Sequence, residues 1–233
     1  MSVLSLVAPL WLALPGLGAA PARAAGPEVD FAACTAPALR LPADIEQAKK
    51  AVITVITPDG NGTGFIVQPD GRAVTAAHVV GDHKKVTVRF VSGRELEAAV
   101  VRSVPHRDLA LIDVAGAGHP CLPVAEARAD AGSEVFAIGS PLGTALAFSV
   151  SKGVVSGYPE MNGATMLQTD ASINKGNSGG PILALNGAVL GVVSWKAVGE
   201  TVEGVSFAVP AGRVRGNGAS SAARAAGMIG LDR

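Results

Sequence analysis

Three residues, a serine, a histidine and an aspartate, lie in segments whose local sequences could make them reactive. Ser178 sits in the turn-rich stretch 174–181, which holds three glycines and two asparagines. Glycine permits backbone angles and close approaches that other residues resist. Such a turn can present a serine hydroxyl while neighbouring N–H groups point at a developing oxyanion. An ordinary hairpin loop is the alternative, because Asn, Gly and Ser are common turn residues.

His78 and Asp108 are the candidate partners of this serine. His78 follows two alanines at the end of a strand-like run, and small residues there let an imidazole lie against packed backbone. Asp108 directly precedes the apolar run 109–114, so its carboxylate should be partly buried and need a partner such as an imidazole N–H. A core histidine and a strand-capping aspartate are the alternatives. The weaker candidates are His83, His106, His119 and Asp113.

A histidine, an aspartate and a serine that each lie in their own loop form a Ser-His-Asp arrangement for nucleophilic catalysis. In it the serine attacks, the histidine takes up its proton, and the aspartate fixes the histidine tautomer. Here the first two residues fall in the first half of the chain and the serine falls in the second half. We therefore expect them to meet in a cleft between the two halves.

The segments that must position these residues have the pattern of an all-β protein. Short apolar and β-branched runs, divided by turn signals, fill residues 52–114 and again 134–209. About six short strands in each half predict barrels or a sandwich, with 122–132 as the bridge. A short helix is expected within 41–50, and two separate strands are expected at 147–151 and 154–157.

The composition fits a well-packed core and excludes some partners. The 233 residues are 48% hydrophobic, 16% charged and 4% aromatic, so aliphatic side chains must fill the interior. Nineteen basic and nineteen acidic residues give no net charge, which argues against nucleic acid or an anionic membrane as the main partner. The sequence contains no metal-ligand cluster and no phosphate-binding glycine loop, so we expect no metal and no cofactor.

The first 24 residues are expected to be a signal peptide. This apolar stretch is interrupted by Pro9 and Pro15, and Ala22-Arg23-Ala24 fits a small-x-small cleavage site. It is too short and too broken to span a membrane comfortably, so we expect no stable span after cleavage. No Lys or Arg precedes the apolar run, which leaves an uncleaved anchor as the alternative. Export predicts a periplasmic or secreted protein, with an extension at 25–44 and a tail at 213–233.

The only two cysteines, Cys34 and Cys121, are a candidate disulfide. An even cysteine number in an exported chain is typical of pairing. Two separate buried thiols remain the alternative.

Several motifs in a single order resemble the trypsin-like serine proteases of the HtrA/Deg group. Three carry the candidate residues: Thr75-Ala76-Ala77-His78, Asp108-Leu109-Ala110-Leu111 and Gly176-Asn177-Ser178-Gly179-Gly180-Pro181. Four other phrases agree, at 62–67, 137–143, 168–174 and 207–210. The resemblance covers about residues 45–212, essentially the whole part expected to fold.

This resemblance implies a chymotrypsin-like fold of two six-stranded barrels, at about 45–120 and 133–212, with the active site in the cleft between them. It also implies a serine endopeptidase that acts on unfolded or specific proteins or peptides through His78, Asp108 and Ser178. The oxyanion hole would be built by Gly176, Asn177 and Ser178, with the N–H groups of the first and last as donors.

The resemblance also points to substrate-binding residues on two segments. They are Ser172, Ile173 and Asn174 before the serine turn, and Val193, Ser194 and Trp195 on a later strand. Cleavage after Arg or Lys needs a carboxylate six residues before the serine, where this chain has Ser172. We therefore expect small or medium apolar P1 residues.

The expected domain content departs from many members of the group, while the oligomeric state and the activity stay open. Only a short tail follows Pro210, so no PDZ domain is expected. Both a trimer and a monomer are compatible with the resemblance. The alternative function is a protease-fold binding or chaperone-like protein whose triad is held inactive, since intact residues alone do not establish activity.

Overall fold

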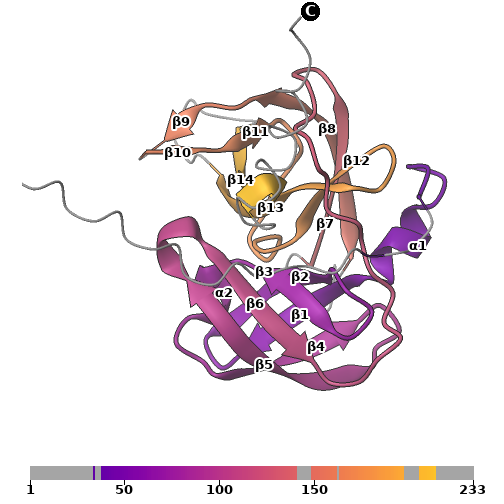
Figure 1. Ribbon diagram of the computed structural model, residues 1–233, viewed down its shortest axis with the longest axis vertical. Coiled ribbons are helices and arrows are strands. Elements are labelled where there is room, and N and C mark those ends of the chain that lie inside the picture. The colour runs from indigo at the N-terminus through magenta and orange to yellow at the C-terminus, as the bar shows by residue number, and fades with distance from the viewer. Residues whose placement is uncertain (1–33, 35–37, 141–147, 162, 197–204, 214–233) are drawn as a thin grey trace, which may run out of the picture.

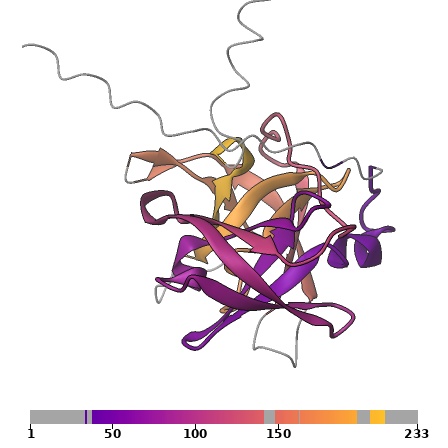
Figure 2. The same cartoon turned by 60° about the horizontal axis from the view of Figure 1, so that its bottom comes forward.

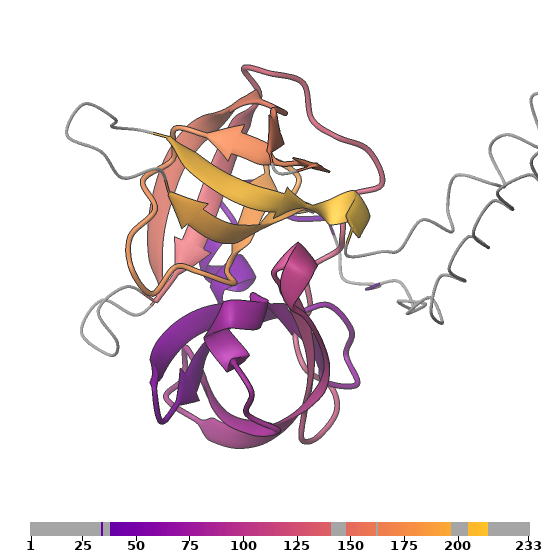
Figure 3. The ribbon, with the colours of Figure 1, turned by 90° about the vertical axis from the view of Figure 1, so that its left-hand side faces the viewer.

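Two closed antiparallel barrels of six strands each make up the fold, which confirms the predicted chymotrypsin-like architecture. The computed structural model describes residues 34, 38–140, 148–161, 163–196 and 205–213. The predicted signal peptide, most of the 25–44 extension and residues 214–233 of the predicted tail lie outside these residues. Figure 1 shows the two barrels stacked one on the other, and Figure 3 shows the first barrel nearly end-on.

The first barrel has the strand order β1-β2-β3-β6-β5-β4, and the second has the order β11-β14-β13-β12-β7-β8. The strands of the first barrel are β1 (Val52–Thr57), β2 (Gly60–Ile66), β3 (Arg72–Thr75), β4 (Lys85–Phe90), β5 (Glu95–Val104) and β6 (Leu109–Val114). Those of the second are β7 (Glu134–Gly139), β8 (Ser149–Gly157), β11 (Leu167–Thr169), β12 (Pro181–Ala184), β13 (Val189–Lys196) and β14 (Ser206–Pro210).

Short elements complete the structure. A two-stranded sheet, β9 (Glu160–Met161) and β10 (Ala164–Thr165), projects from the second barrel. The helical segments are α1 (Ile45–Lys49), α2 (Ala77–Val80), η1 (Pro105–Arg107) and η2 (Ala211–Arg213). Figures 1 and 2 both show α1 and α2 on opposite sides of the molecule.

Alternating apolar residues close each barrel around its own core, and a third core joins the two barrels. In β4, for example, Val86, Val88 and Phe90 point inward while their neighbours are exposed or half-buried. The joining core takes side chains from both barrels, including Phe65, Val74, Leu111, Ile138, Val192 and Phe207. Because this core is shared, the two barrels pack against each other and are held in a fixed relative position.

One strand prediction was wrong. Instead of two strands at 147–151 and 154–157, a single strand β8 runs over Ser149–Gly157, while residue 147 lies outside the described residues. Lys152 and Gly153 separate the two expected strands, and in the structure both lie inside the single strand. A Cβ at Gly153 would lie 2.4 Å from both the Ala171 nitrogen and the Asp170 carboxylate, so this glycine allows a close backbone approach within the strand.

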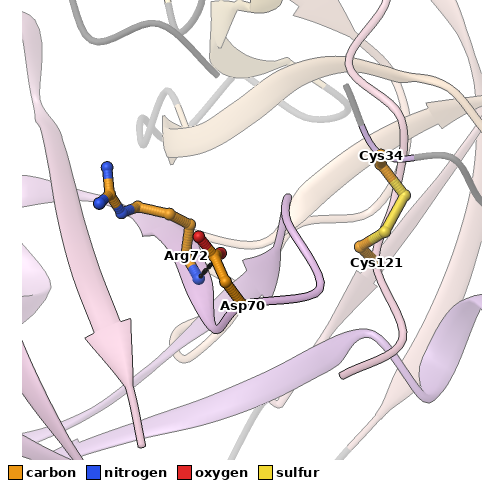
Figure 4. The surroundings of a disulfide bond; sticks show 4 residues. All are labelled: Cys34, Asp70, Arg72 and Cys121. Atoms are coloured by element: carbon orange, nitrogen blue, oxygen red, sulfur yellow. Dashed lines mark hydrogen bonds between the residues drawn. A yellow bond between two sulfur atoms is a disulfide. The ribbon is translucent and has the colours of Figure 1, made fainter. Parts of the chain in front are cut away.

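The N-terminal segment is fixed to both barrels. Cys34 and Cys121 form a disulfide that joins residues 87 positions apart (Figure 4). The Leu41 N–H donates to the Leu185 carbonyl at 2.8 Å, which ties the segment to the β12–β13 hairpin. No helix in the described part of the chain has the length and apolar character needed to cross a membrane.

Candidate active site

His78 lies on α2, a single helical turn that starts directly after β3. Ala76 and Ala77 before it are buried, so their small side chains let the turn pack closely onto the barrel. Gly81, at φ 51°, ends the turn and donates its N–H to the Ala77 carbonyl. The imidazole is half exposed (51%), so the ring is open to solvent.

Asp108 lies between η1 and β6, directly opposite His78. It has left-handed backbone angles (φ 50°), which aspartate tolerates better than most residues, and its N–H closes the η1 turn onto the Pro105 carbonyl. Its carboxylate oxygens lie 2.9 and 3.0 Å from His78 Nδ1, and one also accepts the His78 backbone N–H at 3.1 Å. The Ser194 hydroxyl donates to the same carboxylate. These bonds fix the position of the imidazole ring.

The pKa values of this pair are shifted in opposite directions. The hydrogen bond to Asp108 raises the pKa of His78 above 6.5, although partial burial of the ring acts against this. Burial acts to raise the pKa of Asp108, but the hydrogen bonds from His78 and Ser194 outweigh it and hold that pKa below 3.8. At neutral pH Asp108 is therefore ionised and stabilises a proton on His78.

Ser178 is half-buried in a tight loop between β11 and β12. Its hydroxyl donates to the Ser194 carbonyl at 3.3 Å, and its own carbonyl accepts the Thr63 N–H at 2.8 Å. The next residue, Gly179, has φ +84°, and a Cβ there would lie only 2.1 Å from the Thr63 carbonyl. Glycine is therefore required for the loop to reach the first barrel.

Two backbone N–H groups of this loop are free to bind an anion. Within the described part of the chain, the N–H groups of Gly176 and Ser178 have no hydrogen-bond acceptor. The N–H of Asn177 between them donates to the Asn174 carbonyl at 3.0 Å. Gly176 has φ 97°, which only glycine adopts readily. A pair of unpaired N–H groups beside a serine hydroxyl is the arrangement that stabilises a tetrahedral oxyanion.

Comparison with known proteins agrees with this geometry. Residues 62–192, more than half of the chain, match the family described as trypsin-like peptidase domain. The chain belongs to the trypsin-like peptidase family.

Its relatives include members of the HtrA/Deg group. It is 40% identical over 169 residues to serine protease HTRA2, mitochondrial, from Bos taurus, which covers 68% of this chain and 35% of the relative. It is 39% identical over 156 residues to a probable periplasmic serine endoprotease DegP-like from Pseudomonas putida (strain W619), covering 64% and 32%. The chain thus spans about a third of the length of these curated relatives.

A solved structure of a serine endoprotease from Yersinia pestis has the same fold. It superposes with a TM-score of 0.65 at 32% identity, covering 75% of this chain and 65% of that one.

The residues predicted to bind substrate in this trypsin-like peptidase are in different environments. Ser172 and Asn174 are exposed beside the serine loop. Trp195 is 41% exposed and packs against Phe207, with ring centroids 4.4 Å apart and ring planes tilted by 32°. Ile173 and Val193 are instead buried in the core of the second barrel. Ser194 is buried too, and its hydroxyl is bound to Asp108.

The other histidines make separate contacts. His83 Nε2 lies 2.8 Å from a carboxylate oxygen of Asp59, and His119 is buried and stacked on Phe90. Neither contact involves the serine loop. Within the described ranges, no group of three or more His, Cys, Asp or Glu residues could hold a metal ion.

Sequence analysis missed Thr63, which contacts the serine loop, and Thr75, which contacts Thr63. The Thr63 hydroxyl donates to the Gly176 carbonyl at 2.6 Å, and the Thr75 hydroxyl donates to the Thr63 carbonyl at 2.7 Å. Thr63 is 113 positions from Gly176 in the sequence, so no local pattern could have revealed this contact. Only the packing of one barrel on the other creates it.

Proposed function

We propose that this chain is an exported serine endopeptidase that hydrolyses peptide bonds through an acyl-enzyme made on Ser178. One observation carries the proposal. Ser194 binds Asp108 through its hydroxyl and Ser178 through its carbonyl, while Asp108 binds His78, so all three candidate residues belong to one hydrogen-bonded network. The network brings together the three side chains that a Ser-His-Asp mechanism uses.

In the first half of the reaction Ser178 Oγ turns from the Ser194 carbonyl toward His78. His78 takes the hydroxyl proton as Oγ attacks the substrate carbonyl, and it then gives that proton to the leaving amine. Asp108 keeps the Nδ1 proton in place and stabilises the imidazolium. In the second half His78 activates water in the same way, and Ser178 is released.

The negative charge of each tetrahedral intermediate is bound by the N–H groups of Gly176 and Ser178. Both donors are backbone groups. The peptide that carries the Ser178 N–H is held by the bond from the Gly180 N–H to the Asn177 carbonyl, so this donor needs little rearrangement when the charge develops. Loss of one such donor typically lowers kcat by about 10²–10³-fold.

The substrate pocket accepts small or medium apolar P1 side chains. The position that needs a carboxylate for Arg or Lys is occupied by Ser172, which is exposed beside the serine loop. Trp195 and Asn174 form other parts of the pocket rim. Ile173 and Val193 do not touch the substrate. They pack in the core beneath the rim and support it.

Protein or peptide chains are the proposed substrates, and the proposed location is the periplasm or the exterior. The apolar stretch 1–24 supports export, as does the similarity to proteins named periplasmic. The enzyme works as a monomer or trimer and needs no metal or cofactor for the chemistry described.

The test uses the protein without residues 1–24 and its Ser178→Ala variant. Each is mixed with an unfolded protein and with a fluorophosphonate probe. We expect the parent to cleave the substrate and to be labelled, and the variant to do neither. Cleavage that survives in Ser178→Ala would contradict the mechanism.

The P1 preference has its own test. Cleavage sites mapped in the digest should follow small or medium apolar residues such as Val, Ala or Leu. Ser172→Asp should add cleavage after Lys and Arg, while Asn174→Asp serves as a control for added charge nearby. If neither variant gains such cleavage, Ser172 does not lie at the base of the pocket.

A second candidate function is a binding or chaperone-like protein whose triad is held inactive. It is favoured by the bond from the Ser178 hydroxyl to Ser194, because in the described structure this hydroxyl makes no hydrogen bond to His78. Folded parent protein that binds unfolded chains but is neither labelled nor active would support this candidate instead.

A further inference from the structure

Thr63 is a fully buried residue of β2 whose three polar groups make four hydrogen bonds. Its N–H donates to the Ser178 carbonyl at 2.8 Å, and its own carbonyl accepts the Thr75 hydroxyl at 2.7 Å. Its hydroxyl donates to the Gly176 carbonyl at 2.6 Å and accepts the Ser140 N–H at 2.9 Å. One residue of the first barrel thus binds carbonyls on both sides of Asn177 in the second barrel.

The direction of the hydroxyl bond follows from its neighbours. An N–H can only donate, so the Ser140 N–H must use a lone pair of the Thr63 oxygen. The hydroxyl proton is then left for the Gly176 carbonyl, which can only accept. This leaves one arrangement, in which both of the hydroxyl's bonds are satisfied.

Most peptide groups of the serine loop are held in place. The Asn177 N–H binds Asn174 and its carbonyl accepts the Gly180 N–H at 2.9 Å, which fixes the direction of the Ser178 N–H. The exception is the peptide between Lys175 and Gly176. Among the described residues, neither the Lys175 carbonyl nor the Gly176 N–H has a partner.

The Lys175–Gly176 peptide carries one of the two proposed oxyanion donors. It can rotate about the bonds of Gly176, which as a glycine resists rotation little. The Thr63 hydroxyl holds the carbonyl on the far side of Gly176 at 2.6 Å, and so it fixes the adjacent peptide plane. Without that bond, both planes that meet at Gly176 could turn, and the donor could leave its alignment.

We propose that Thr63 is a positioning residue for the oxyanion hole, which acts on the Gly176 N–H through the Gly176 carbonyl. This inference rests on the proposed function. The hydroxyl does not touch the substrate. It aligns a donor before the charge develops, so its effect belongs to the transition state and should change kcat rather than KM.

The test compares variants of the mature protein on a peptide substrate. Thr63→Val keeps the shape and removes the hydroxyl, whereas Thr63→Ser keeps the hydroxyl. Thr169→Val is a matched control, because the Thr169 hydroxyl is also buried, donates to a carbonyl (Val154, 2.7 Å) and accepts an N–H (Ala171, 3.1 Å). Thr63→Ala is the substitute if the valine variant does not fold.

We expect Thr63→Val to lower kcat by at least about tenfold, and by no more than the roughly 10²–10³-fold that loss of a whole donor causes. Its KM should change by less than about threefold, and Thr63→Ser should recover most of the activity. The acidic limb of the kcat/KM profile against pH should have the same midpoint in Thr63→Val as in the parent, because the substitution leaves the His78–Asp108 pair unchanged. Thr169→Val should lose similar thermal stability and keep its kcat.

Two results would overturn the inference in different ways. If the parent cleaves the peptide and Thr63→Val has the same kcat as Thr169→Val, the positioning role is wrong and the proposed function stands. If the parent and Ser178→Ala are equally inactive, the proposed function fails and the positioning role fails with it.

Discussion

The hydroxyl of Ser194 donates a hydrogen bond to the carboxylate of Asp108, and so links β13 of the second barrel to the start of β6 in the first. The same residue accepts the Ser178 hydroxyl on its carbonyl at 3.3 Å. Ser194 itself is only 5% exposed, and both contacts are partly buried. The relative positions of the acid and the nucleophile therefore depend on one buried residue that contacts both.

We predict that Ser194→Ala weakens both the fold and the activity. Hydrogen bonds to charged groups contribute about 1.5–3 kcal/mol, so the free energy of unfolding should fall by about that amount. The orientation of Asp108 loosens, and kcat/KM should fall by roughly tenfold. Urea unfolding and peptide hydrolysis measure the two effects.

The control for this variant is Ser156→Ala, an exposed serine on β8 of the same barrel. It should change stability by no more than about 0.5 kcal/mol. If Ser194→Ala behaves like this control in both assays, the bridge to Asp108 contributes nothing measurable.

The pH dependence of activity should reflect the raised pKa of His78. Only the neutral imidazole can accept the serine proton, and the hydrogen bond to Asp108 raises its pKa above 6.5. We therefore predict that kcat/KM increases with pH through a midpoint above 6.5. Asp108→Asn should lower this midpoint and reduce kcat by about 10⁴-fold. A parent midpoint at or below 6.5 would contradict the effect of Asp108.

The same shifts predict how stability depends on pH. Because the folded pKa of His78 is raised, its contribution is complete below pH 6.5 and is lost as pH rises through the raised value. The pKa of Asp108 is lowered, so its contribution is present above pH 3.8 and is lost as pH falls through the lowered value. Urea titrations of the parent and Asp108→Asn should differ most between these limits.

Much of this site could be predicted from sequence because each candidate residue lies in its own local motif. His78 follows buried alanines, Asp108 precedes a buried strand, and Ser178 sits among glycines. The barrel strands other than β8 follow from short apolar runs and turns, and β8 was expected as two strands. What could not be predicted depends on packing between distant segments. Thr63 reaches Gly176 only because the barrels touch.

The roles of the residues predicted to bind substrate were harder to predict from sequence, for a related reason. A motif locates a residue along the chain but does not say which way its side chain points. In the structure Ile173 and Val193 point into the second core, and the Ser194 hydroxyl points at Asp108. Side chains alternate along an extended chain, so neighbours in one motif have different surroundings.

Substitutions at two glycines, Gly179 and Gly93, distinguish the cost of backbone strain from the cost of a steric clash. Gly179 and Gly93 both have φ +84°, so alanine is strained equally at each position. A Cβ at Gly93 meets nothing within 4 Å, whereas at Gly179 it would lie 2.1 Å from the Thr63 carbonyl and 2.3 Å from the Thr75 hydroxyl. We predict that Gly93→Ala destabilises by about 1–2 kcal/mol. Gly179→Ala should exceed this by about 1–3 kcal/mol.

Thermal unfolding and fluorophosphonate labelling test this pair. Gly93→Ala should be labelled like the parent, while Gly179→Ala should be labelled slowly because the serine loop is pushed from the first barrel. Equal destabilisation by both variants would mean that the serine loop can move away from the first barrel without a further loss of stability.

The disulfide between Cys34 and Cys121 should stabilise the folded chain mainly by restricting the unfolded one. It closes 87 residues, for which the chain-entropy model gives about 4–5 kcal/mol. We predict that Cys34→Ala/Cys121→Ala lowers the free energy of unfolding by about 2–5 kcal/mol. Activity at low temperature should change little, because neither cysteine belongs to the hydrogen-bonded network of His78, Asp108, Ser194 and Ser178.

Reduction provides the control for this prediction. A reductant should lower the unfolding midpoint of the parent to near that of the double variant, and it should leave the double variant unchanged. The Leu41 bond to Leu185 keeps the N-terminal segment on the β12–β13 hairpin without the disulfide, so the native fold should persist in both. A parent whose midpoint does not respond to reductant, although free thiols are released, would show that this cross-link does not stabilise the fold.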